Sequence, residues 1–401
     1  MRLVHKNNNL IGLIGCLIFL SPAFSSQTKL AIKNYGSVTT GAQQFEAYLP
    51  KLKNKRVGIV TNATGLVGNV SIVDTLIRLR VNIKKIFGPE HGFRGNVEAG
   101  EKVQTNKDAK TGLTVISLYG SNKKPTKSQL KGLDVVVYDI QDVGVRFYTY
   151  ISTLCYVMEA CAENNKELIV LDRPNPNGFY IDGPVLRNEF KSFLGLHNVP
   201  LVYGMTTGEY AKMANAEGWL KNNVKCNLTV IPLKNYDRTA SYKLPAKPSP
   251  NIPNADAVLL YPSLGLFEGT IMSLGRGTDF PFQVIGHPSF SDTAFSFTPK
   301  PSALSISPKY VNQRCYGLDL RKDTYLKAHP KKINLFWIST FYAALSKPDF
   351  FDENFNYHAG NVDLKQQLKN KISESEIRKS WQADIESFKK IREKYLLYED
   401  F

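Results

Sequence analysis

The sequence lacks the short motifs that mark several large enzyme classes. It contains no GxSxG elbow, no GxxxxGK[ST] loop, no HExxH pair and no complete GxGxxG run. These absences argue against an ordinary serine hydrolase, a nucleoside-triphosphate enzyme, a zincin and a dinucleotide-dependent oxidoreductase. No internal repeat, heptad run or extended low-complexity tract occurs either.

Cysteine is scarce, and its spacing fits no zinc site. Cys155 and Cys161 lie six residues apart in a predicted helix, "TLCYVMEACAENN", and therefore point to roughly opposite or at best adjacent sides, which argues against a disulfide between them. We expect Cys155, Cys161, Cys226 and Cys315 to be core residues.

Long apolar runs are absent outside the first 26 residues, so the sequence predicts no stable membrane span. That first segment, "MRLVHKNNNLIGLIGCLIFLSPAFSS", has basic residues, then an apolar run, then small residues, which is typical of a signal peptide at 1–26. We therefore expect an exported protein, periplasmic or extracellular. The stretch "LIGC" resembles a lipoprotein processing box, but the apolar run continues past Cys16, so lipid anchoring there is the less favoured alternative.

Acidic residues are outnumbered by basic ones, and the net charge is +16. Without Arg2 and Lys6 of the signal segment, 49 basic residues face 35 acidic ones, which leaves +14. Such a charge favours anionic partners, but export makes nucleic acid a poor candidate. The lysines are spread along the chain, which favours a solvated basic surface over a dedicated patch.

Strands and helices alternate from Lys55 onward, which predicts an α/β fold. The chain length suits one large domain and a smaller one, or two domains of medium size. Apolar, largely β-branched runs predict strands at 56–61, 83–88, 113–118, 134–140, 167–172 and 256–262, and helical spacing appears in "SIVDTLIRL" and "YTYISTLCYVMEACAENN". This alternation indicates a Rossmann-like layered, mostly parallel sheet with right-handed crossovers.

Unusual loops follow five of these predicted strands, where the ligand sites of such sheets lie. They are "NATG", "PEHGFRG", "QDVGVRFY", "RPNPNG" and "SLGLFEGT". Loops rich in Asn, Arg, Gly and acids pack poorly and hold ligands well.

The composition changes after about residue 270, towards Pro, Ser, Phe and Thr. We therefore expect a Rossmann-like catalytic domain at 30–270 and a smaller mixed C-terminal domain at 271–401 that closes a cleft. A final charged helix is predicted at roughly Glu374–Tyr398.

The predicted loops hold a surplus of carboxylates, which points to glycoside cleavage. That reaction needs one protonated carboxyl to donate to the leaving oxygen and a second, negative group to stabilise the sugar cation or activate water. Glu90, in "PEHG", suits the role of the proton donor, because partial burial would favour its protonated form. Glu268, in "LFEGT", is the candidate partner, although a simple salt bridge is an open alternative.

Several long motifs together resemble the exo-β-N-acetylmuramidase family of exolytic peptidoglycan hexosaminidases. They are "GPEHGFRG", "YDIQDVGVRFYTYISTL", "LDRPNPNG...DGPVL", "VPLVYGMTTGEYAKM", "PSPNIP" and "YPSLGLFEGT...SLGRGTDFPF", in consistent order from about residue 40 to 290. The resemblance implies a Rossmann-like domain with a smaller C-terminal domain and a cleft between them. It also implies release of N-acetylmuramic acid from the non-reducing end of peptidoglycan fragments, with Glu90 as a catalytic residue. We expect no cofactor.

Substrate contacts are predicted on the same loops. His91 could orient Glu90 or bind a sugar hydroxyl. A guanidinium can hold the lactyl carboxylate of muramic acid with two parallel hydrogen bonds, and the amide of an asparagine suits hydroxyl and acetamido groups. The candidate binding residues are Arg94, Asp139, Asp142, Arg146, Arg173, Asn175, Asn251 and Arg276.

Two other function classes stay open at this stage. His91, Asp139, Asp142 and His287 could converge on one divalent ion in a metal-dependent cell-wall hydrolase, although their spacing has no ligand periodicity. The same cleft could also capture muropeptides without cleaving them. In each case the expected partners are peptidoglycan-derived oligosaccharides or muropeptides.

Overall fold

The computed structural model describes residues 37–94, 105–240, 242–303, 305–321 and 331–401, and these belong to one compact unit. The predicted signal peptide, with Cys16, lies outside the described residues. So does the stretch at 95–104 that follows Arg94.

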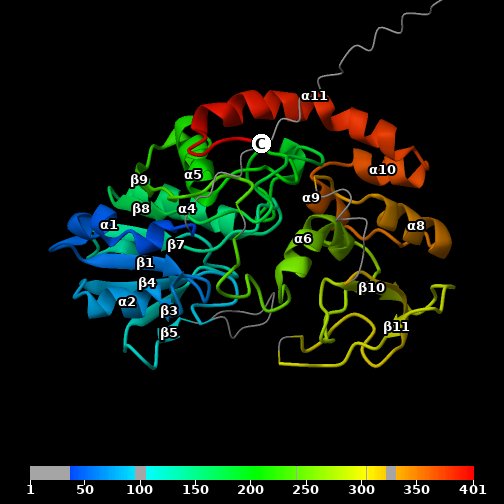
Figure 1. The fold of residues 1–401 in the computed structure, drawn as a ribbon, viewed down its shortest axis with the longest axis horizontal. Coiled ribbons are helices and arrows are strands. Elements are labelled where there is room, and N and C mark those ends of the chain that lie inside the picture. Colours follow the sequence, from blue (N-terminus) through cyan, green and yellow to red (C-terminus); the bar gives the residue numbers. More distant parts are fainter. Residues whose placement is uncertain (1–36, 95–104, 241, 304, 322–330) are drawn as a thin grey trace, which may run out of the picture. The chain divides into compact units, whose positions relative to one another are not determined.

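A seven-stranded sheet with the order β5-β6-β4-β1-β7-β8-β9 forms the N-terminal part (Figure 1). Every neighbouring pair is parallel except β5 and β6. The strands are β1 (Val57–Thr61), β4 (Ile83–Gly88), β5 (Asn106–Lys107), β6 (Thr114–Ser117), β7 (Val135–Asp139), β8 (Glu167–Leu171) and β9 (Asn227–Ile231), and a separate hairpin joins β2 (Leu66–Val67) to β3 (Val70–Ser71).

Helices cover both faces of this sheet because its central strands are apolar on both sides. In β7, Val135 and Val137 pack in one cluster with α1 and α2, whereas Val136 and Tyr138 pack in another with α4. The helices and 3-10 turns of this part are η1 (Gly41–Gln43), α1 (Phe45–Leu52), α2 (Ile72–Arg78), α3 (Lys127–Leu130), α4 (Tyr150–Glu163), η2 (Asn188–Phe190), α5 (Thr207–Ala216) and η3 (Lys221–Asn223).

The C-terminal part combines a small antiparallel sheet, of order β10-β12-β11, with several helices. Its long last helix begins at Glu374, where the Ser373 side chain accepts a hydrogen bond from the Glu376 backbone N–H. The elements from residue 255 onward are α6 (Ala255–Leu264), η4 (Gly265–Gly269), β10 (Val284–His287), β11 (Ser296–Phe297), β12 (Cys315–Asp319), α8 (Phe336–Leu345), α9 (Phe355–Ala359), α10 (Asp363–Lys369), α11 (Glu374–Arg392) and η5 (Glu393–Tyr395).

The predicted fold class is confirmed, and so are the first five strands, both helical patterns and the final charged helix. The strand predicted at 256–262 is wrong. These residues form α6, whose N-cap Asn254 accepts from the Ala257 backbone N–H. Strand β9 was not predicted, because "NLTVI" is short and mixes polar with apolar residues. The domain boundary at 270 stays a prediction.

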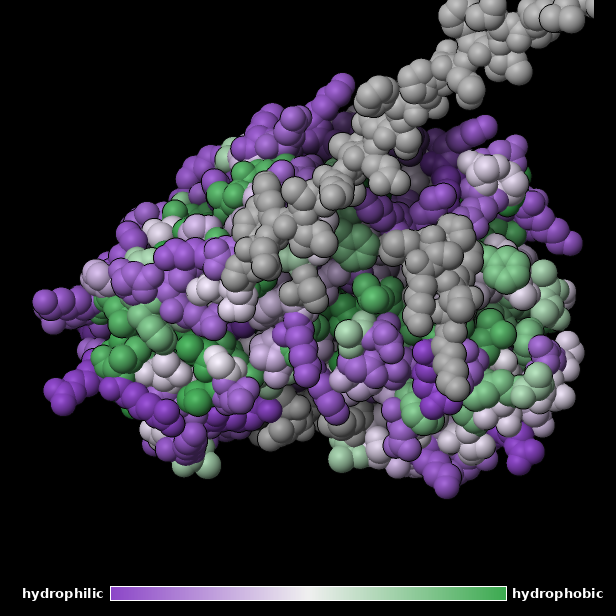
Figure 2. Space-filling model, in the orientation of Figure 1, coloured by the Kyte–Doolittle hydropathy of each residue, from purple (hydrophilic) through white to green (hydrophobic). Residues whose placement is uncertain are grey.

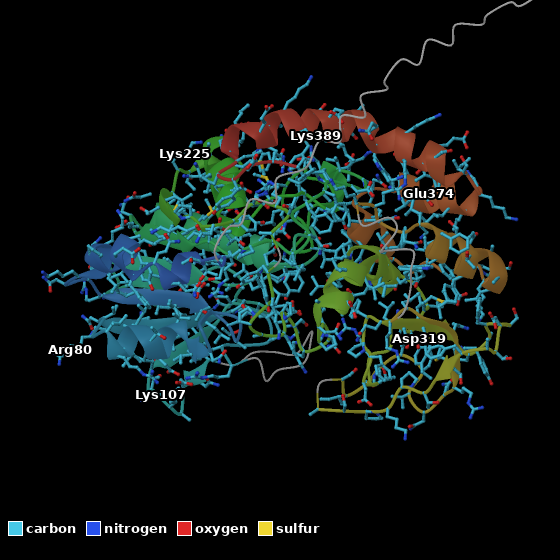
Figure 3. All side chains as sticks on the ribbon, in the orientation of Figure 1. Arg80, Lys107, Lys225, Asp319, Glu374 and Lys389 are labelled. Carbon is cyan, nitrogen blue, oxygen red and sulfur yellow. The ribbon has the colours of Figure 1, made fainter. Side chains whose placement is uncertain are left out.

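Charged side chains lie in many separate parts of the chain, as the labelled Arg80, Lys107, Lys225 and Lys389 illustrate (Figure 3). Hydrophilic residues cover much of the visible face, with hydrophobic patches between them (Figure 2). The four cysteines from Cys155 to Cys315 are buried free thiols. No helix in the described part of the chain has the length and apolar character needed to cross a bilayer.

Candidate active site

A pocket of about 200 Å³ collects side chains from distant parts of the chain. Glu90 and His91 come from the loop after β4, and Asn251 comes from the "PSPNIP" stretch. Glu268 and Arg276 come from η4 and the loop beyond it. All five were predicted as site residues, and the fold brings them into one pocket.

The turn after β4 points Glu90 and His91 into this pocket. Strand β4 ends at Gly88, and the Gly92 backbone N–H closes a turn on the Pro89 carbonyl at 2.9 Å. His91 takes the left-handed backbone conformation, with φ at 68°, and Gly92 follows with φ at 74°. Because residues with side chains seldom adopt this conformation, the turn holds a strained histidine beside the glutamate.

Hydroxyl groups hold both side chains of this turn. The Thr149 hydroxyl donates a hydrogen bond to Glu90 Oε2 at 3.1 Å. His91 Nε2 lies 3.3 Å from Ser249 Oγ, which also accepts from the backbone N–H of Asn251 at 3.3 Å. His91 is thus fixed by the same serine that positions Asn251.

Glu268 and Arg276 form an ion pair at the pocket wall. Arg276 Nη2 donates to Glu268 Oε1 at 2.7 Å, and the guanidinium carbon lies 5.0 Å from the centre of the Phe282 ring. The side chains are 25% and 28% exposed, so a bound ligand can reach them. The salt bridge that the sequence left open for Glu268 is therefore present.

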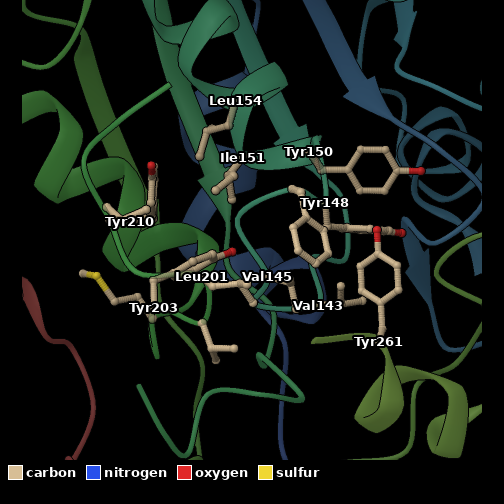
Figure 4. Packing of buried hydrophobic residues seen from close by; sticks show 14 of the residues in the cluster. Val143, Val145, Tyr148, Tyr150, Ile151, Leu154, Leu201, Tyr203, Tyr210 and Tyr261 are labelled. Carbon is tan, nitrogen blue, oxygen red and sulfur yellow. The ribbon is translucent and has the colours of Figure 1, made fainter. Parts of the chain in front are cut away.

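Tyrosines surround the two carboxylates. Tyr148 packs edge-on against Tyr150 and Tyr261, with ring centres 4.8 and 5.8 Å apart (Figure 4). Burial and then the Glu90 charge raise the pKa values of Tyr119 and Tyr150, and burial followed by the Glu268 charge raises that of Tyr261. These phenols stay neutral near pH 7 and can donate hydrogen bonds.

Asp139 and Arg173 bind each other in the interior instead of lining the pocket. Arg173 Nε and Nη2 donate to the two oxygens of Asp139 at 2.6 and 2.9 Å, and both side chains are almost fully buried. Asp142 is also buried and accepts from the Gly144 backbone N–H at 2.7 Å and from the Tyr203 hydroxyl. A structural role accounts for the contacts of all three.

Arg94, Arg146 and Asn175 also bind protein groups. Arg94 forms a two-pronged pair with Asp108 at 3.0 and 2.9 Å. Fully buried Arg146 donates to four backbone carbonyls, two of them at His358 and Ala359, and so joins the N-terminal part to α9. Asn175 Nδ2 donates to the Met205 carbonyl at 2.8 Å. None of the three belongs to the described pocket lining, and their role in substrate binding stays a prediction.

The four residues considered for a metal have separate partners, and those of Asp142 are the Gly144 backbone N–H and the Tyr203 hydroxyl. Asp139 pairs with Arg173, His91 contacts Ser249, and His287 Nδ1 accepts from the Ser289 backbone N–H at 2.9 Å. In the described ranges, no three His, Cys, Asp or Glu residues are grouped so as to hold an ion. Among the described residues, these four side chains therefore do not form a metal-binding group.

Several residues of the pocket escaped prediction. Thr149 and Tyr150 follow the "QDVGVRFY" loop and Ser249 sits in "PSPNIP", so their neighbourhood was a usable signal. Phe193 and His358 also line the pocket. His358 comes from α9, more than two hundred residues after Glu90, and no motif marks it.

Comparisons with known proteins agree with this arrangement. Family models described as exo-beta-N-acetylmuramidase NamZ, N-terminal and C-terminal, match residues 57–256 and 259–398. The chain is 39% identical over 379 residues to the peptidoglycan beta-N-acetylmuramidase NamZ of Bacillus subtilis (strain 168), which covers 88% of this chain and 89% of that protein.

Two crystal structures of DUF1343 family proteins from Bacteroides fragilis NCTC 9343 share the fold. The first has a TM-score of 0.85 and 43% identity, and the match covers 91% of this chain and 100% of the other. The second has a TM-score of 0.75 and 31% identity, over 90% of this chain and 99% of the other.

Proposed function

Because the chain belongs to the exo-β-N-acetylmuramidase NamZ family, and is therefore a glycoside hydrolase with peptidoglycan muramidase activity, we propose that it acts from the non-reducing end. In this proposal each turnover releases one N-acetylmuramic acid from a peptidoglycan fragment. The observation that carries it is the small pocket that gathers Glu90, His91, Asn251, Glu268 and Arg276.

The size of the pocket supports exo action. Its volume of about 200 Å³ is below the roughly 300–1,000 Å³ typical of pockets for drug-sized ligands. Such a pocket fits a terminal sugar, whereas a chain cut in its middle would need a longer groove. Aromatic side chains such as Phe147 and Phe193 line it and offer apolar surface to the sugar ring.

Glu90 is the proposed general acid. Its proton passes to the glycosidic oxygen as the bond from that oxygen to the anomeric carbon breaks. Water supplies the new hydroxyl on the sugar, and the remaining proton of that water restores the protonated Glu90 by the end of the turnover. The Thr149 hydroxyl donates a hydrogen bond to Glu90 Oε2 and so helps to fix the orientation of this carboxyl group in the pocket. His91, fixed by Ser249, is proposed to support this loop and to contact a sugar hydroxyl.

Glu268 is proposed as the second, negative carboxylate of the site. Its carboxylate lines the pocket and pairs with Arg276 at 2.7 Å, and a negative group in this place suits stabilisation of positive charge on the sugar. Asn251 lies in the same pocket and is proposed to bind the acetamido or hydroxyl groups of the substrate.

Export is part of the proposal. A peptidoglycan substrate lies outside the cytoplasmic membrane, and residues 1–26 have the sequence pattern of a signal peptide. Lipid attachment at Cys16 remains the less favoured alternative. The mass of the secreted protein tests both possibilities, because removal of residues 1–26 and lipid attachment at Cys16 give different masses.

The decisive experiment compares two substrates with different leaving groups. Residues 27–401 are incubated with the disaccharide of N-acetylmuramic acid and N-acetylglucosamine, and separately with 4-nitrophenyl β-N-acetylmuramic acid. Glu90→Gln should lower kcat on the disaccharide by about 10²–10⁴-fold. The loss should be much smaller on the nitrophenyl substrate, because nitrophenolate leaves without a proton.

Glu163→Gln on α4 serves as the control, because Glu163 is paired with Lys124 away from the pocket. Full activity of Glu90→Gln on the disaccharide would rule out Glu90 as the acid. If the parent protein binds the sugars and cleaves neither substrate, the chain is a muropeptide-binding protein.

A further inference from the structure

Three of the four arginines predicted to contact substrate have their donors bound by protein groups. Arg94 is bound by Asp108, Arg173 by Asp139, and Arg146 by backbone carbonyls. None of the three lines the pocket, and Arg146 and Arg173 are almost fully buried, so a substrate carboxylate could reach these two only by disrupting buried contacts.

Arg276 differs from these three in position and in bonding. It lines the pocket, and within the described chain its guanidinium makes a single hydrogen bond, from Nη2 to Glu268. A guanidinium carries several more N–H donors in a rigid planar fork. Most of the donors of Arg276 are therefore available to a ligand.

Two neighbours fix the guanidinium without using up its donors. Glu268 holds one edge at 2.7 Å, and the Phe282 ring lies 5.0 Å from the guanidinium carbon, a cation–π distance. A held guanidinium loses less conformational entropy when it binds a second partner. This combination is a preorganised receptor for a planar anion.

We propose that Arg276 binds the carboxylate of the 3-O-lactyl group of N-acetylmuramic acid and is the specificity-determining residue of the site. This inference rests on the proposed function and deepens it. N-acetylglucosamine differs from N-acetylmuramic acid only by lacking the lactyl ether, so the pocket must recognise that group to separate the two sugars. Glu268 positions Arg276 in addition to facing the reacting sugar.

The test measures kcat/KM for three substrates: 4-nitrophenyl β-N-acetylmuramic acid, its lactyl methylamide, and 4-nitrophenyl β-N-acetylglucosamine. The methylamide keeps the shape of the lactyl group and removes its charge. Arg276→Ala should lower kcat/KM on the acid by on the order of 10- to 100-fold more than on either neutral substrate, mostly through KM; any loss caused by its contact with Glu268 is shared by all three substrates. The kcat/KM of Arg276→Lys on the acid should lie between those of the parent and Arg276→Ala, because lysine keeps the positive charge but lacks the planar guanidinium.

Arg321 provides the matched control. It also pairs with a carboxylate, Asp319, at 2.7 Å and stacks over a ring, Phe280, at 3.7 Å, but it lies outside the described pocket lining. In Arg321→Ala, the ratio of kcat/KM on the acid to kcat/KM on the methylamide should be the same as in the parent. A change in that ratio would overturn a specific role for Arg276.

Other outcomes separate this inference from the proposed function. Equal cleavage of acid and methylamide by the parent, or equal losses on both in Arg276→Ala, overturns the inference and leaves the proposed function standing. No cleavage of any substrate counts against the proposed function. In that case calorimetric titration with free N-acetylmuramic acid still decides the inference, because equal binding by parent and Arg276→Lys, or no binding by the parent, overturns it.

Discussion

At the scale of single residues, Asp142 couples folding to pH. Burial raises its pKa to about 6 against an ordinary value of 3.8, even though Tyr203 and Gly144 donate hydrogen bonds to it. A raised pKa means that the native state binds the proton more tightly than the unfolded chain. Its contribution to stability is therefore complete below about pH 4 and is lost as the pH rises through 6.

Asp142→Asn should remove this dependence. The drop in the free energy of unfolding from pH 4 to pH 7 should shrink by roughly 2 kcal/mol, measured by urea unfolding at several pH values. Asp134→Asn is the control, because the pKa of Asp134 is shifted in the opposite direction to that of Asp142. Arg56 lowers the pKa of exposed Asp134, so that variant should alter the profile only at about pH 4 and below. An unchanged slope between pH 4 and 6 in Asp142→Asn would contradict the assignment.

At the scale of elements, the junction of α6 and η4 carries the pocket wall. Gly265 begins η4 in ordinary helical conformation, with φ at −61°, so alanine there would normally gain about 1 kcal/mol of helix propensity. A methyl group at Gly265, however, would overlap the ring of Phe147. We expect Gly265→Ala to lower the free energy of unfolding by about 1–3 kcal/mol and to raise KM.

Phe147→Leu in the same chain should recover part of this loss, because it removes the overlapping ring edge. Urea unfolding of the two single variants and the double variant gives the coupling between the sites. Strictly additive losses would mean that the methyl group and the ring do not meet.

At the scale of the whole molecule, the last residues of the chain return to the N-terminal sheet. The Tyr398 hydroxyl donates to the buried Asp172 at 2.5 Å and accepts from the Leu233 backbone N–H at 2.9 Å. The Leu397 backbone N–H donates to Glu209 at 2.8 Å. The C-terminus therefore satisfies buried acids near β8 and β9.

Tyr398→Phe should lower the free energy of unfolding by about 1–3 kcal/mol, because it leaves a buried carboxylate short of a donor. Calorimetry should show one transition at lower temperature, since all described residues form one compact unit. Tyr357→Phe, at a 38% exposed position on α9, should change the transition little. If calorimetry instead showed two transitions and Tyr398→Phe lowered the temperature of only one of them, the tail would stabilise only part of the chain.

The sequence predicted the sheet well where strands are continuous runs of β-branched residues buried on both faces, as in β7 and β8. It failed at 256–262, because a short apolar run reads equally as a strand or as a buried helix. The cap at Asn254 was the overlooked signal. For the site, loop position indicated Glu90 and Arg276 but equally indicated Arg146 and Asp139, which the fold turns inward.

The sequence by itself determined the family, the fold class and the loops from which a site could be built, because hydrophobic patterns and long motifs are local properties of the chain. The tertiary structure alone decided which loop side chains meet. Whether a guanidinium faces a ligand or a buried partner depends on contacts between distant segments, as with Arg173 and Asp139. His358 reaches the same pocket as Glu90 only because α9 packs beside η4 and Arg146 binds its carbonyl.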